Sequence, residues 1–239
     1  MVGQGETSRI PFVGIMAKAP RAGHAKTRLT RALTPEIAAD LYRHFLLDTI
    51  DVVRRVPHAA PALLCPSGDG PNLRRLAPAL TVVEQPQPGL MQGLAFGIEH
   101  ALGLGHPMAV LINADSPTLP PERIREAIEM LATHDVVLGP TADGGYYLIA
   151  ATVPCSHLLC EAPYLNGATI CVETLTRARR LGLRTDLIAP WFDVDLPVEL
   201  HRLMRAVRDQ PAHVAAHTRR ALAFYEGALR KLADDGAGI

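Results

Sequence analysis

The sequence predicts an α/β fold in which a parallel sheet carries helices on both faces. Short apolar runs alternate with amphipathic stretches of about 10–15 residues, a pattern typical of strands joined by crossover helices. The composition, with 48% hydrophobic and 20% charged residues, is that of a globular protein. No internal repeat or low-complexity linker interrupts the 239 residues, so we expect a single domain over 1–239.

The first half of the chain alternates between predicted strands and helices. Phe12–Met16 has the pattern of a buried strand, and a loop broken by Pro and Gly follows it over residues 17–30. Thr34 as N-cap and Pro35 in the first turn begin a helix whose apolar spacing continues to about residue 56. The next predicted elements are strands at 62–65 and 81–84, a helix at 90–104 and a strand at 108–113.

The second half continues the alternation. Pro120 and Pro121 open a helix that runs to about residue 133. Two strands, 136–138 and 146–150, are joined by a turn-rich segment. A helix at 169–181, a strand at 183–188 and a final pair of helices complete the prediction, and we expect Asp195 to be the N-cap of the first of this pair.

Charge and hydropathy argue against several functional classes. The 24 basic and 24 acidic residues give a formal net charge of zero, whereas a general nucleic-acid-binding protein needs excess Lys and Arg. The apolar runs are far shorter than the ~20 residues of a membrane helix. The N-terminus lacks a signal-peptide pattern, so we expect a cytoplasmic protein that binds neither nucleic acid nor membrane. The oligomeric state stays open, a homodimer included.

The four cysteines are expected to be reduced thiols in the core, because a chain of this size needs no disulfides. Two alternatives are metal ligation by Cys155, His157 and Cys160, or by His213 and His217 at helical spacing. Neither pattern is accompanied by the rest of a zinc ligand set, so both are weaker than the structural interpretation.

A cluster of basic residues follows the first predicted strand. Residues 18–31 hold five Lys or Arg, and no acidic residue occurs between Glu6 and Glu36. Cations on a Gly- and Pro-containing loop at the carboxyl end of a strand suit a polyphosphate ligand. The spacing is not that of a Walker A loop, because two residues separate Gly23 from the next Lys. The alternative is a solvated basic turn.

Three aspartates later in the chain are candidate metal ligands. Asp115 comes directly after the predicted strand 108–113, where a carboxylate can hold Mg²⁺ or Mn²⁺ against phosphate oxygens. Asp193 and Asp195 lie in a later segment and, if the chain folds as one sheet, could meet Asp115 and complete a metal site. The structural alternatives are a turn residue for Asp115 and a helix cap for Asp195.

A fourth segment, Asp143-Gly144-Gly145-Tyr146-Tyr147, contains adjacent glycines that let the backbone approach a ligand or make a hairpin turn. The two tyrosines alternate between the faces of a strand, so we expect one of them in the core. No Ser-His-Asp order and no HExxH motif supports a hydrolase.

Together these segments resemble the DUF2064 family of the glycosyltransferase-A (nucleotide-diphospho-sugar transferase) superfamily. The motifs are Lys18-x-Pro20-x-x-Gly23-x-x-Lys26-Thr27-Arg28, Asp115-Ser-Pro-x-Leu-Pro120, Gly139-Pro-x-x-Asp143-Gly-Gly-Tyr-Tyr-Leu148 and Asp193-Val-Asp195. More distantly, the chain resembles phospholactate and molybdenum-cofactor guanylyltransferases. The resemblance implies a three-layer Rossmann-like GT-A fold with a mostly parallel mixed sheet. It further implies a nucleotide half at about 10–115, an acceptor half at about 116–205 and C-terminal helices at 195–231.

The resemblance also implies roles for individual residues. The nucleotide-binding residues would be Lys18, Pro20, Gly23, Lys26, Thr27, Arg28 and Asp115. The divalent metal ligands would be Asp115, Asp193 and Asp195; the catalytic residues, Lys26, Asp115 and Asp143; the acceptor-binding residues, Gly144, Gly145, Tyr146 and Tyr164. The chain departs from the family at 90–94, where an Asp-Leu-Gly-x-Arg element is common, and at 164–166, where Trp-Ser-Thr is usual.

Three functions are compatible with these features. The first is nucleotidyl transfer from a nucleoside triphosphate to a small phosphorylated acceptor with release of pyrophosphate, which the number of loop cations favours. The second is glycosyl transfer from a nucleotide-sugar, with Asp143 as a candidate base. The third is a nucleotide-binding regulator without turnover, which the two departures from the family pattern permit.

Overall fold

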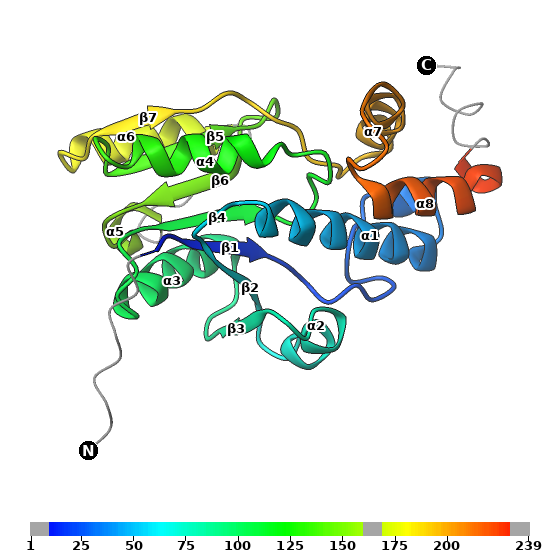
Figure 1. Cartoon of the computed structure of the whole chain (residues 1–239), viewed down its shortest axis with the longest axis horizontal. Coiled ribbons are helices and arrows are strands. Elements are labelled where there is room, and N and C mark those ends of the chain that lie inside the picture. Colours follow the sequence, from blue (N-terminus) through cyan, green and yellow to red (C-terminus); the bar gives the residue numbers. More distant parts are fainter. Residues whose placement is uncertain (1–9, 160–168, 230–239) are drawn as a thin grey trace.

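The computed structural model describes residues 10–159 and 169–229. Its sheet has the strand order β3-β2-β1-β4-β6-β5-β7, and only β6 runs antiparallel to its neighbours (Figure 1). The strands are β1 (Phe12–Met16), β2 (Ala60–Pro66), β3 (Thr81–Gln85), β4 (Ala109–Asn113), β5 (Val136–Pro140), β6 (Tyr146–Ala151) and β7 (Thr185–Leu187). The mostly parallel mixed sheet is confirmed.

Helices cover both faces of this sheet, as predicted (Figure 1). The helices are α1 (Pro35–Arg54), α2 (Gly70–Leu76), α3 (Leu90–Gly103), α4 (Pro121–Met130), α5 (Ser156–Leu159), α6 (Ile170–Arg180), α7 (Pro197–Asp209) and α8 (Ala216–Phe224), with a 3₁₀ turn at Leu29–Arg31. None of the described helices is long and apolar enough to cross a membrane.

Alternation along the strands separates two cores. On β1, Val13 and Ile15 face the core beneath α1, α2 and α4, whereas Phe12 faces the core beneath α3, α5 and α6. A third apolar cluster joins the outer side of α1 to α7 and α8. The helix α1 is therefore packed on two sides, which explains its eleven buried residues.

Most predicted elements are confirmed within a few residues of their expected ends. Thr34 accepts the backbone N–H of Ile37 at 3.3 Å and is the N-cap of α1, as expected. The sequence did not reveal α2 and α5, because these helices are too short to show an apolar period.

Three of the four cysteines lie in the described part of the chain, and all three are reduced thiols in the core, as predicted. Cys65, Cys155 and Cys171 are free thiols in the two sheet cores. Burial raises the pKa of Cys65 and of Cys155 to about 12, so neither is a reactive thiolate at neutral pH. Cys160 lies outside the described residues.

The alternative that His213 and His217 are metal ligands on one helix is wrong, because α8 begins at Ala216 and His213 precedes it. Ligand atoms of Asp48, Asp51 and His217 do lie within 4.8 Å of one another. However, Asp48 accepts the backbone N–H groups of His217 and Thr218 at 2.9 and 2.7 Å. This buried carboxylate on α1 therefore caps the N-terminus of α8 and docks it.

An ion pair at the edge of the sheet gives a pH prediction. Arg184 donates from its side chain and its backbone N–H to Asp135, and these bonds hold the pKa of Asp135 at about 2. Because that pKa is below the unfolded value of about 4, the pair stabilises the protein above pH ~4 and is lost as the pH falls toward ~2. We expect Asp135→Asn to lower the free energy of unfolding by about 1 kcal/mol at neutral pH, since Arg184 is largely exposed.

Urea unfolding of both proteins between neutral pH and pH ~2 checks this expectation. The difference between wild type and Asp135→Asn should shrink across the acidic part of the range. A difference that stays constant with pH would assign the effect to lost packing rather than to charge.

Candidate functional site

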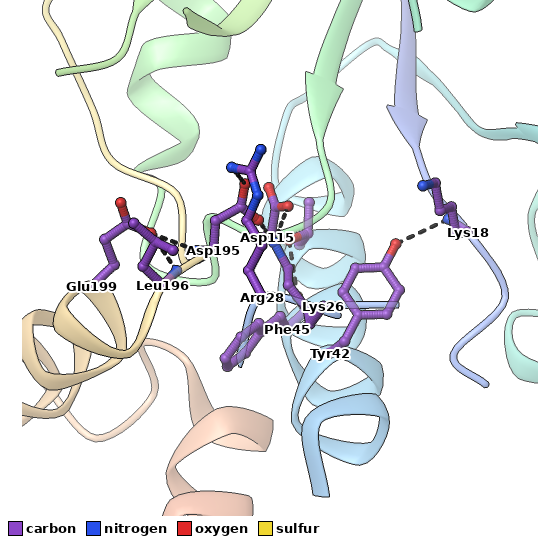
Figure 2. A network of polar contacts seen from close by, with 10 residues as sticks. Lys18, Lys26, Arg28, Tyr42, Phe45, Asp115, Asp195, Leu196 and Glu199 are labelled. Carbon is purple, nitrogen blue, oxygen red and sulfur yellow. Dashed lines mark hydrogen bonds and ion pairs between the residues drawn. The ribbon is translucent and has the colours of Figure 1, made fainter. Parts of the chain in front are cut away.

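The carboxyl edge of the sheet gathers the segments that the sequence singled out. Six strands are parallel, so the loops after β1, β4, β5 and β7 all begin at this edge. The loop after β1 crosses to the segments that follow β4 and β7, which places Lys26 between Asp115 and Asp195 (Figure 2). The candidate site is therefore built from pieces that are up to 169 residues apart in the sequence.

Lys26 is the centre of the arrangement. Its ammonium pairs with Asp115 Oδ2 and lies 2.5 Å from Asp195 Oδ1, and only 4% of its side chain is exposed. Burial alone would lower the pKa of Lys26, but the two carboxylates outweigh it and raise the pKa above its usual value. Its φ of 50° lies in the left-handed region, which is uncommon for a residue with a side chain. The fold thus holds a fully charged ammonium in a buried position.

Two carboxylates pair with this buried ammonium, and a third, that of Asp193, interacts with the cluster through its charge. The backbone N–H of Val194 donates to the carbonyl of Asp115 at 3.1 Å and ties the segment after β7 to the segment after β4. Burial, together with the charges of Asp115 and Asp195, raises the pKa of Asp193 to about 7. Lys26 overcomes the burial of Asp195 and keeps the pKa of that carboxyl below its usual value. The buried carboxylates of the cluster therefore outnumber its buried ammonium.

The prediction that Asp195 is a helix N-cap is wrong. Leu196 occupies the cap position of α7, and Glu199 accepts the backbone N–H groups of Asp195 and Leu196 at 2.6 and 2.7 Å. Glu199 thus closes the start of α7 from within the helix, and the carboxylate of Asp195 pairs with Lys26 instead (Figure 2). Arg28 also reaches Asp195, at 3.6 Å.

The basic loop is anchored at its other end too. Asp69, which follows β2, pairs with Arg21, and the hydroxyl of Tyr42 accepts the backbone N–H of Lys18 at 2.9 Å. Although no acid lies near these cations in the sequence, the fold brings acids from distant segments into contact with them. Within the described part of the chain, Lys18 is exposed and forms no ion pair.

The remaining loop residues form a turn. Gly23 has a φ of 71°, which a residue with a side chain rarely adopts, so glycine is required there for the backbone. Pro20 is partly buried, and Thr27 is exposed with its carbonyl accepting the hydroxyl of Thr30 at 2.6 Å.

The hairpin between β5 and β6 lies at the same edge but contacts none of the three aspartates by a described polar interaction. Asp143 accepts the hydroxyl of Thr141 at 2.5 Å and the N–H of Gly145 at 3.2 Å, which orders the turn. Gly144 has a φ of 89°. Tyr146 is partly exposed and Tyr147 is buried, as expected for one core tyrosine. Tyr164 lies outside the described residues.

The segment between β4 and α4 concentrates unsatisfied polar atoms. Buried side-chain oxygens without a hydrogen-bond partner occur there on Asn113, Asp115, Ser116 and Thr118. Such groups are rare in folded proteins and indicate a missing ligand, ion or water. Asp115 Oδ1 lies beside carboxylates that outnumber the buried ammonium, and oxygen ligands with excess negative charge fit Mg²⁺ or Mn²⁺.

Two residues of this region were not singled out from the sequence. Asp69 precedes a helix too short to be predicted, and Glu199 sits in the first turn of α7. The Leu-Pro-Val-Glu run at the start of α7 carries a Glu three residues after the cap, a signal that could have identified Glu199. Asp69-Gly70-Pro71 is a local helix-start signal, but nothing near Asp69 in the sequence marks it as a partner of the basic loop.

The chain is similar to several known proteins. Residues 49–165 match a family described as uncharacterised proteins conserved in bacteria (DUF2064). A 3-phospho-D-glycerate guanylyltransferase of Phenylobacterium zucineum (strain HLK1) is 30% identical over 196 residues, which are 76% of this chain and 84% of that protein.

Solved structures share the fold. One from Desulfovibrio desulfuricans G20, provisionally assigned as a nucleotide-diphospho-sugar transferase, has a TM-score of 0.83 at 26% identity and covers 93% of this chain and 97% of that one. A nucleotidyl transferase from Methanothermobacter has a TM-score of 0.61 at 15% identity, over 84% of this chain and 99% of that one. The second similarity concerns the fold alone.

Proposed function

The chain is a transferase of the DUF2064 family, and we propose that it transfers a nucleoside monophosphate from a nucleoside triphosphate to a small phosphorylated acceptor, releasing pyrophosphate. The observation that carries the proposal is the meeting of Lys26, Asp115 and Asp195 at the carboxyl edge of the sheet. Nucleotidyl transfer depends mainly on positioning and charge neutralisation around phosphates, and this cluster combines buried charges of both signs. The guanylyltransferase relative supports GTP as the first donor to test.

The basic loop would bind the triphosphate. Lys18 and Arg28 are exposed cations on this loop, and Lys26 lies between the acids where the phosphates would approach them. Pro20, Gly23 and Thr27 would shape the turn around the phosphates. The count of loop cations is by itself a weaker argument for a triphosphate than the sequence indicated, because Arg21, Lys26 and Arg28 already face acids.

A divalent cation, Mg²⁺ or Mn²⁺, would be held by Asp115, Asp193 and Asp195. When bound, it would neutralise charge on the phosphates and orient them for in-line attack. Lys26 would contact the phosphate oxygens near the reacting phosphorus. Lys26 and the three aspartates would together form the donor side of the proposed active site.

The acceptor would bind beside the hairpin after β5. Gly144 and Gly145 allow close approach of a ligand to the backbone, and Tyr146 is partly exposed next to them. Asp143, which orders this turn, is the proposed catalytic residue on the acceptor side. Tyr164 would be a further acceptor-binding residue. The name of the relative suggests 3-phospho-D-glycerate as the first acceptor to test. We expect the acceptor to be a small molecule and the protein to act in the cytoplasm.

Glycosyl transfer is the second candidate, because the structure with 93% coverage is assigned to the nucleotide-diphospho-sugar transferases. In that reaction Asp143 would be the base, and a nucleoside diphosphate would leave. A regulator that binds nucleotide without turnover is the third.

The leaving group distinguishes these functions. Incubation with Mg²⁺, each nucleoside triphosphate and phosphorylated small acids should release pyrophosphate only in mixtures that contain the correct donor and acceptor. Nucleotide-sugars are assayed in parallel for nucleoside diphosphate. Diphosphate release from a nucleotide-sugar, with no binding of any triphosphate, would contradict nucleotidyl transfer. Binding of a triphosphate without either product would favour the regulator.

A further inference from the structure

Asp69 is a buried acid whose side chain is directed away from its own helix. It occupies the N-cap position of α2, yet its carboxylate makes no cap bond to that helix. An N-cap aspartate ordinarily accepts a backbone N–H in the first turn that follows it. Only 1% of Asp69 is exposed, so its carboxylate needs partners elsewhere.

Those partners all lie on the basic loop after β1. Asp69 Oδ2 accepts the backbone N–H of Ala19 at 2.8 Å and lies 3.5 Å from Nε2 of His24, and Oδ1 pairs with Nη2 of Arg21. One carboxylate thus connects three positions within six residues of this loop. Both ends of the loop are fixed by aspartates, because Asp115 and Asp195 hold Lys26 at the other end.

Arg21 keeps donors available after this pairing. Its side chain is half exposed, and the contact with Asp69 uses Nη2 alone among the nitrogens of the guanidinium. A guanidinium has five N–H donors in a rigid plane, so a carboxylate on one edge fixes the direction of the others. A cation fixed in this way can contact phosphate oxygens without first being ordered.

We propose that Asp69 is a positioning residue that orients Arg21 and the start of the basic loop for the polyphosphate of the donor. The inference rests on the proposed function, since it assigns the substrate group that this end of the loop recognises. Asp69 itself touches no substrate. It acts through the guanidinium of Arg21 and the backbone at Ala19.

The test is Asp69→Asn, which retains an acceptor for Ala19 but removes the charge that pairs with Arg21. We expect the variant to bind inorganic tripolyphosphate and the nucleoside triphosphate about tenfold or more weakly in calorimetry at fixed Mg²⁺. The KM for the triphosphate should rise by a similar factor, whereas the KM for the acceptor should stay within about twofold.

Glu84→Gln is the matched control. Glu84 also accepts a backbone N–H, from Gly68 at 2.8 Å, and pairs with an arginine, Arg74, at 3.1 Å, but it makes no contact with the basic loop. A purely structural role for Asp69 would lower the melting temperature without a selective change in triphosphate binding, as expected of Glu84→Gln. Equal affinity of Asp69→Asn and wild type for both phosphate ligands would overturn the proposal.

Arg21→Lys keeps the proposal testable should Asp69→Asn not fold. This variant retains the positive charge but loses the planar group that Asp69 orients. We expect it to weaken tripolyphosphate binding severalfold, and wild-type affinity would overturn the orienting role. Failure of the proposed function is separate, because it is read on the wild-type protein alone: either no nucleoside triphosphate binds, or one binds and no pyrophosphate is released.

Discussion

Replacing Asp115 by Asn should reduce turnover at least about a hundredfold while the protein stays folded. The substitution keeps a side-chain acceptor near Lys26 but removes one of the negative charges that would hold the divalent cation. Loss of metal-assisted charge neutralisation costs several kcal/mol of transition-state stabilisation. Calorimetric titration with Mg²⁺ and the triphosphate, beside the pyrophosphate assay, measures binding and turnover separately.

The melting temperature in the absence of metal should not fall in this variant. Asp115, Asp193 and Asp195 repel one another around a single ammonium, so one charge fewer relieves repulsion. Asp209→Asn is a suitable control, because Asp209 is an exposed carboxylate at the last residue of α7, outside this cluster and outside the group of Asp48, Asp51 and His217. Full activity of Asp115→Asn with unchanged metal dependence would make Asp115 a turn residue.

The fold could be predicted from the sequence because its signals are local. The buried run Phe12–Met16 and the Thr34-Pro35 helix start need only the spacing of side chains and the geometry of caps. The antiparallel direction of β6 is not encoded by such spacing, and it entered the prediction through the family resemblance. The short helix α2 was missed, and Asp69 with it.

The sequence singled out several of the residues that meet at the carboxyl edge of the sheet, but it did not show how they pair. Asp115 could be selected because it follows a buried strand and Asp195 because it belongs to a late pair of aspartates, whereas their contact with Lys26 depends on the path of the whole chain. The same reason explains two corrections. The loop cations pair with acids that follow β2, β4 and β7 and are distant in the sequence, and Leu196 rather than Asp195 is the N-cap of α7.

Burial of Lys26 changes what its substitution should do to stability. Lys26→Met is expected to destabilise the metal-free protein by about 3–5 kcal/mol, because it leaves Asp115 and Asp195 in a buried position without their cation. Arg28→Ala is the matched control from the same loop: the Arg28 side chain is 66% exposed, so its removal should change stability by less than about 0.5 kcal/mol.

Mg²⁺ should restore part of the stability that Lys26→Met loses. A divalent cation that binds the folded carboxylates supplies the missing positive charge, and a ligand that binds only the folded state raises its stability. Urea unfolding with and without Mg²⁺ should therefore show a larger gain for Lys26→Met than for wild type or Arg28→Ala. An identical gain in all three proteins would mean that Mg²⁺ does not bind at these carboxylates, and the metal assignment of Asp115, Asp193 and Asp195 would fail.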